Sequence, residues 1–119
     1  MTTIKILDLP LKKEWYNMIE SGEKREEYRE IKPYWQNRLA LYDNRDKLIG
    51  TNPCGYTHVR FRYGYTKRAM LYVIDWITIG RGNPNWGAPT DKDVFIIQFH
   101  KEASPIIKGQ ELCQELRPI

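Results

Sequence analysis

The sequence predicts a single α+β domain over residues 1–119, in which about five strands form a small β-barrel or curled sheet flanked by two or three helices. Two observations carry this prediction. Helical spacing of apolar residues is concentrated in the first third of the chain and returns briefly at Leu112 and Leu116, whereas the second half is rich in β-branched and aromatic runs. The apolar content of 41% and the aromatic content of 13% fit one packed core.

The first two expected elements are a strand and a helix. Residues 4–9 are apolar-rich and stop before Pro10, which predicts a short strand followed by the first turn of a helix. We expect this helix to end at Ser21 and Gly22, because glycine commonly follows the last helical turn. The apolar residues that recur at helical spacing on its buried face are Leu11, Trp15, Met18 and Ile19.

The charged run 23–30 is interpreted as a short strand, because Gly22 closes the preceding helix and Pro33 restricts the residues before it. Residues 34–41 then predict a second helix. The stretch 43–55 is rich in Asn, Asp, Gly and Pro, and we expect a loop there.

The second half of the chain predicts three further strands. Residues 59–63 alternate apolar and basic side chains, and residues 69–79 form a long β-branched and aromatic run. The connection 64–67 between them has the composition of a hairpin turn. Residues 83–89 form a turn-rich loop, and residues 94–99 form the last strand.

The N-terminal residues contain no basic segment followed by an apolar run, as a secretory signal would. No apolar stretch approaches the ~20 residues that a membrane span needs. We therefore expect a cytoplasmic protein without a membrane partner.

The sequence indicates no metal site and no cofactor. The four Cys and His residues that could bind zinc do not have the spacing of a zinc site. We interpret them as ordinary thiols and imidazoles. The segment 80–82 is glycine-rich but leads into a turn, so it lacks the helix of a phosphate-binding loop. No motif indicates a Ser-His-Asp arrangement. Cys54 and His58 come nearest to a catalytic Cys-His pair, but their spacing gives that role little support. The four potential zinc ligands are Cys54, His58, His100 and Cys113.

The excess of positive over negative charge is confined to the middle of the chain. The chain has 19 basic and 15 acidic residues, yet residues 31–68 alone have eight basic and two acidic ones. The same segment holds seven of the fifteen aromatic residues. Because single-stranded nucleic acid is held by basic groups on its phosphates and aromatic faces against its bases, this composition favours such a partner. A solvated strand face beside ordinary core aromatics explains the same pattern.

The densest polar cluster follows the first helix, where Gly22, Lys24, Glu27 and Arg29 spell Gly-x-Lys-x-x-Glu-x-Arg. In a strand, Glu27 and Arg29 point to the same face about 6–7 Å apart, and Lys24 can approach them from the turn. The two cations can hold a phosphate or a base carbonyl, and the carboxylate can accept from a base amino group. The alternative is a solvated run of Glu and Lys, since exposed ion pairs contribute little stability.

At this motif the sequence resembles the ASCH domain family, whose signature is the same Gly-x-Lys-x-x-Glu-x-Arg pattern. The resemblance implies a PUA-like β-barrel flanked by helices, a cleft beside the motif, and RNA binding as the activity. The segments that carry the likeness are Leu9 to Lys12, Trp15, Ile19 and Ser21 to Arg29, and less sharply residues 59–64, 71–80 and 94–100.

Our leading expectation is therefore a protein that binds RNA or a modified nucleotide in a cleft lined by the motif. Trp86 is either a mobile aromatic over this cleft or a packed surface residue. The residues expected to extend a track for phosphates are Arg60, Arg62, Lys67 and Arg68.

The resemblance also implies an enzymatic alternative. A bacterial branch of similar fold hydrolyses the amide of N4-acetylcytidine with a Lys and a Thr in a Lys-x-x-Thr version of the motif, together with a Glu. Lys24 matches that Lys, but Glu27 stands where the Thr would be, so the hydroxyl nucleophile is missing. Other ASCH proteins are reported as ribonucleases. In a hydrolase of either kind Lys24 and Glu27 would be catalytic, and a non-catalytic interaction module is the third alternative.

Overall fold

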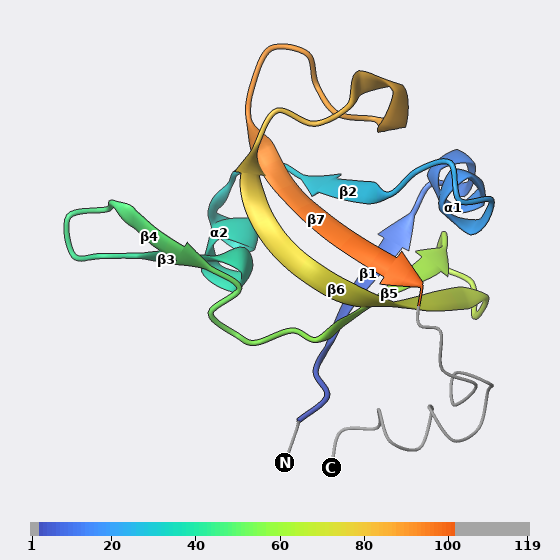
Figure 1. The fold of residues 1–119 in the computed structure, drawn as a ribbon, viewed down its shortest axis with the longest axis horizontal. Coiled ribbons are helices and arrows are strands. Elements are labelled where there is room, and N and C mark those ends of the chain that lie inside the picture. The colour runs from blue at the N-terminus through green and yellow to red at the C-terminus, as the bar shows by residue number, and fades with distance from the viewer. Residues whose placement is uncertain (1–2, 102–119) are drawn as a thin grey trace.

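The structure is a computed structural model and describes residues 3–101 (Figure 1). Within this range it contains seven strands, two α-helices and one short 3-10 turn. In chain order these elements are β1 (Ile6–Leu11), α1 (Lys13–Glu20), β2 (Glu26–Arg29), α2 (Pro33–Leu39), β3 (Ala40–Tyr42), β4 (Leu48–Thr51), β5 (His58–Tyr63), β6 (Ala69–Gly80), η1 (Pro84–Trp86) and β7 (Val94–Lys101).

Five of the strands form one curled sheet with the order β1-β5-β6-β7-β2. The pair β1 and β5 is parallel, and the other neighbours are antiparallel. Figure 1 shows the long strands β6 and β7 curving around the body, so that the sheet forms a half-barrel. The predicted α+β class with a curled sheet and two helices is confirmed.

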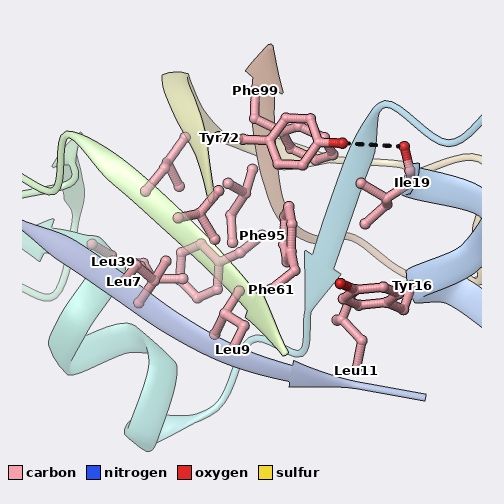
Figure 2. Close-up of a cluster of buried hydrophobic side chains, with 14 residues drawn as sticks. Leu7, Leu9, Leu11, Tyr16, Ile19, Leu39, Phe61, Tyr72, Phe95 and Phe99 are labelled. Carbon is pink, nitrogen blue, oxygen red and sulfur yellow. Dashed lines mark hydrogen bonds between the residues drawn. The ribbon is translucent and has the colours of Figure 1, made fainter. Parts of the chain in front are cut away.

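The core fills the concave side of the half-barrel (Figure 2). Alternate residues of β1 point inward, and Leu7, Leu9 and Leu11 are buried while Asp8 and Pro10 are exposed, as a strand period of two requires. Helix α1 closes one end of the core with Tyr16 and Ile19. The Tyr72 hydroxyl donates to the Ile19 carbonyl at 3.4 Å, which ties β6 to the end of this helix.

The structure differs from the expectation in residues 43–55, where a two-stranded hairpin replaces part of the loop. Strand β4 pairs with β3, and the hairpin projects from the body (Figure 1). Leu48 and Ile49 are exposed, so this strand has no buried face that would mark it in the sequence.

The boundaries of the first elements also differ. Pro10 lies inside β1 rather than starting the helix. Because β1 is an outermost strand, the missing N–H of Pro10 removes no ladder hydrogen bond on its free side. The second helix ends at Leu39, since Ala40 is already extended with φ −128° and ψ 153°. The helical spacing at Leu112 and Leu116 falls outside the described residues.

Candidate functional site

A cleft of about 410 Å³ lies at the open seam of the half-barrel, where the two outermost strands approach each other. The Arg29 side chain spans this seam, because its Nη2 donates to the Pro10 carbonyl at 3.3 Å. The cleft is lined by residues from β1, β2, both helices and the η1 turn, namely Pro10, Leu11, Lys12, Trp15, Glu27, Tyr28, Arg29, Trp35, Trp86 and Gly87.

The three charged residues of the motif form one chain of ion pairs, as the strand spacing predicts. Lys24 Nζ lies 3.1 Å from Glu27 Oε1, and Arg29 Nη1 lies 2.5 Å from Glu27 Oε2. Lys24 is 1% exposed and Glu27 is 5% exposed, so this cluster is not a solvated run of charges. Both oxygens of the Glu27 carboxylate are engaged by the protein itself.

Lys24 lies beneath the cleft rather than in its lining. Its ammonium donates to the Trp86 carbonyl at 2.6 Å and lies 4.7 Å from the centre of the Tyr28 ring. Burial lowers the pKa of Lys24, and the neighbouring Glu27 carboxylate opposes this shift. The buried ammonium therefore joins the end of α1 and the start of β2 to the η1 turn.

Arg29 joins three elements at the base of the cleft. Besides its bonds to Glu27 and Pro10, its Nη1 donates to the Tyr28 carbonyl at 3.0 Å. The centre of its guanidinium lies 5.4 Å from the Trp35 ring of α2. These contacts fix both the guanidinium and one aromatic wall.

Three half-buried tryptophans form the walls: Trp15 from α1, Trp35 from α2 and Trp86 from η1. Gly87 places the turn against Trp15, since a Cβ at Gly87 would lie 3.0 Å from the indole. Gly87 also has a backbone φ of 101°, a conformation that residues other than glycine rarely adopt. Trp86 itself packs on the small apolar cluster of Tyr28, Ala88, Val94 and Ile96.

The segment that carries Trp86 is anchored to β2 through Tyr28. The Tyr28 hydroxyl donates to Glu26 Oε1 at 2.8 Å and accepts from the Asn83 N–H at 2.9 Å. Burial raises the pKa of Tyr28, so the hydroxyl stays neutral and keeps both roles. Arg81 pairs with Asp93 at 3.2 Å across the base of the segment.

Close packing between this segment and Tyr28 makes a testable prediction about Gly82. A Cβ at Gly82 would lie 2.5 Å from the Tyr28 ring and 2.6 Å from Ala88 Cβ. We expect Gly82→Ala to lower the free energy of unfolding by about 1–3 kcal/mol, as overpacking does. Gly50→Ala is the matched control, because a Cβ there meets no atom within 4 Å. Equal stabilities of the two variants in urea unfolding would contradict this account.

The remaining candidate residues lie elsewhere, and none of the basic ones lines the cleft. Arg62 pairs with Asp8 at 2.9 Å, and Arg68 pairs with Glu20 at 3.0 Å. Gly22 has φ 88° and closes α1, a structural task. The residues that occupy β5 and the following turn, outside the cleft, are Arg60, Arg62, Lys67 and Arg68.

Sequence reasoning missed Trp35 and Lys12 as site residues and placed Trp15 on a core-facing helix side. The three come from segments whose meeting depends on the curl of the sheet. A signal was present in the tryptophans, since large aromatic residues are frequent in binding sites.

Within residues 3–101 no group of three or more His, Cys, Asp and Glu side chains is arranged to hold a metal ion. Cys54 is a free, half-buried thiol. Cys113, the other cysteine considered as a zinc ligand, falls outside the described residues. Among the described helices, none has the length and apolar character needed to cross a membrane.

Comparisons of the chain with protein-family models, with curated proteins and with solved structures return no match.

Proposed function

We propose that the chain is a PUA-like domain of the ASCH type that binds RNA or a modified nucleotide, with a base in the seam cleft. The proposal rests on one observation. Three tryptophans form the walls of the cleft, and the Arg29 guanidinium and the Glu27 carboxylate lie together at its bottom. Aromatic side chains stack on nucleobases of any kind. Polar side chains beside the bound base recognise it through hydrogen bonds to its edge. Glu27 and Arg29 of the Gly-x-Lys-x-x-Glu-x-Arg motif line this cleft, and Lys24 is ion-paired with Glu27 beneath it.

The charges around the rings favour a planar, uncharged group over a cation. Aromatic clefts can also hold quaternary ammonium ligands by cation–π attraction. Here the protein places its own cations at the rings, with Arg29 5.4 Å from Trp35 and Lys24 5.4 Å from Trp15. A cationic ligand would meet these two positive charges, whereas a nucleobase would meet stacking surfaces and hydrogen-bonding groups.

The phosphates are assigned to the mouth of the cleft. Lys12 is exposed and belongs to the lining, so its ammonium can reach a phosphate next to a bound base. In this proposal Arg60, Arg62, Lys67 and Arg68 act by general attraction of the polyanion, because they stand outside the cleft.

A titration of RNA into isotope-labelled protein tests the proposal. A single-stranded oligonucleotide is expected to shift the amide signals of residues 22–30 and the indole signals of the three cleft tryptophans. The affinity is expected to fall as salt rises, because phosphate contacts release counterions. Shifts in residues 58–68 would add the basic strand to the contact surface. Unchanged spectra with RNA, single-stranded DNA and free nucleosides would overturn the proposal.

A hydrolase is the second candidate, and the burial of Lys24 favours it. A buried lysine with a lowered pKa beside a carboxylate can take part in proton transfer. Its ammonium is covered by Trp86 and Glu27, so catalysis requires the η1 turn to move and expose Lys24. Turnover of N4-acylated cytidine or RNA that Lys24→Ala abolishes would support an amidohydrolase or a ribonuclease. If neither binding nor turnover occurs, an interaction module remains.

A further inference from the structure

A second hollow of about 310 Å³ is lined by residues of β2, β6, β7 and the η1 turn. It shares Trp86 with the seam cleft, so this one residue forms a wall of both. Its floor is the convex face of the sheet, and Trp76 of β6 is part of its lining.

Sheet register places an exposed aromatic ring beside polar side chains in this hollow. Trp76 is the neighbour of Gln98 on β7, and Gln98 is the neighbour of Glu26 on β2. Cross-strand neighbours point to the same face, so the three side chains form a row. The η1 segment covers Tyr28 and Ile96 on the same face but stops short of this row, and Trp76 remains 60% exposed.

The acidic groups of the hollow already have partners, whereas one cation is open to solvent. Glu26 accepts from the Gln98 amide at 2.9 Å, and Asp75 lies 2.6 Å from His100 Nδ1. Arg25 is exposed and lines the hollow, and no ion pair joins it to another residue in the part of the chain that the structure describes. The hollow therefore offers an indole face for stacking and a guanidinium for a phosphate.

Resting on the proposed function, we propose that this hollow, defined by Trp76 and Arg25, is a second nucleotide subsite. A base held in the seam cleft lies on one side of Trp86, and the adjacent base of the same strand stacks on Trp76. Arg25 contacts a phosphate of that second nucleotide. The ligand class is thus a single-stranded oligonucleotide of at least two nucleotides rather than a free nucleotide.

The four tryptophans of the chain allow each subsite to be observed separately, because three line the seam cleft and the fourth is Trp76. We expect a mononucleotide to shift the indole N–H signals of the three cleft tryptophans alone, and a dinucleotide to shift that of Trp76 as well. Trp76→Ala is expected to weaken dinucleotide binding about tenfold and to leave mononucleotide binding unchanged, given the usual contribution of one stacked base.

The matched control is Tyr65→Ala, which removes a ring that is 94% exposed and lines neither hollow. Equal dinucleotide affinity in Trp76→Ala and the unchanged protein would overturn the second subsite while leaving binding in the cleft intact. A Trp76 signal that moves with protein concentration instead of ligand would assign this surface to self-association and also overturn the subsite. Failure of both ligands to bind would overturn the proposed function, and the subsite with it.

Discussion

Replacing Lys24 with methionine is expected to lower the free energy of unfolding by about 3–5 kcal/mol, the usual cost of removing one partner of a buried ion pair. Glu27 keeps its bond to Arg29 but loses the ammonium at 3.1 Å, and the Trp86 carbonyl loses its donor at 2.6 Å. Methionine fills most of the volume, so the loss reports on charge and hydrogen bonding rather than on a cavity. Urea unfolding followed by circular dichroism measures it.

An exposed lysine that forms an ion pair at the same distance provides the control. Lys92 Nζ lies 3.1 Å from Glu30 Oε2, the same distance as in the buried pair, but both of these side chains are more than half exposed. Lys92→Met is expected to change the stability little, because solvent screens such pairs. Similar losses in the two variants would show that burial does not set the strength of the Lys24 contacts.

A double variant measures how strongly Lys24 and Glu27 are coupled in the folded protein. Lys24→Met combined with Glu27→Leu removes both charges, and Arg29 keeps its bonds to two backbone carbonyls. We expect the double variant to lose less stability than the sum of the Lys24→Met and Glu27→Leu losses, because both single variants break the same Lys24–Glu27 contact, whereas Arg29 loses its carboxylate whenever Glu27 is replaced. Additive losses would contradict the coupling.

Trp86→Ala is expected to weaken binding of a mononucleotide and of a longer RNA by about tenfold or more, because stacking on one aromatic ring contributes roughly 1–3 kcal/mol. The ring is a wall of both hollows, so both ligands lose a contact. The Lys24 ammonium binds the backbone carbonyl of Trp86, which alanine retains. Isothermal titration calorimetry with each ligand measures the effect.

The control for this experiment is Tyr34→Ala. Tyr34 is an exposed ring of α2 whose centre lies 4.7 Å from the Trp35 ring, but it does not line the cleft. It should leave both affinities unchanged. If Trp86→Ala binds a mononucleotide as well as the unchanged protein does, while the thermal unfolding of the two proteins agrees, the indole is not a wall of the binding site.

The strands of the main sheet could be predicted from the sequence because their residues follow simple periods. The segment 59–63 alternates inward and outward side chains, and the predicted strand matches β5 to within one residue. Strand β4 could not be found this way, since Leu48 and Ile49 are exposed and the surrounding residues favour turns. A strand without a buried face leaves no hydrophobic period to detect.

The motif cluster was predictable for the same local reason, because Glu27 and Arg29 stand two residues apart in one strand. The tryptophan walls were not, since they are brought together by the curl of the sheet and the packing of two helices. The basic middle segment shows the reverse effect. Its excess charge is partly cancelled in space, where Arg62 and Arg68 pair with Asp8 and Glu20 from the first thirty residues.

At the seam between β1 and β2, no backbone ladder joins these two outermost strands of the described sheet. Strand β2 is four residues long, and Arg29 reaches from it to a β1 carbonyl across the gap. In the part of the chain that the structure describes, this side-chain contact stands where a closed barrel would have a backbone ladder. A ligand that contacts both edges adds the missing cross-links, so part of its binding energy appears as resistance of the whole sheet to opening.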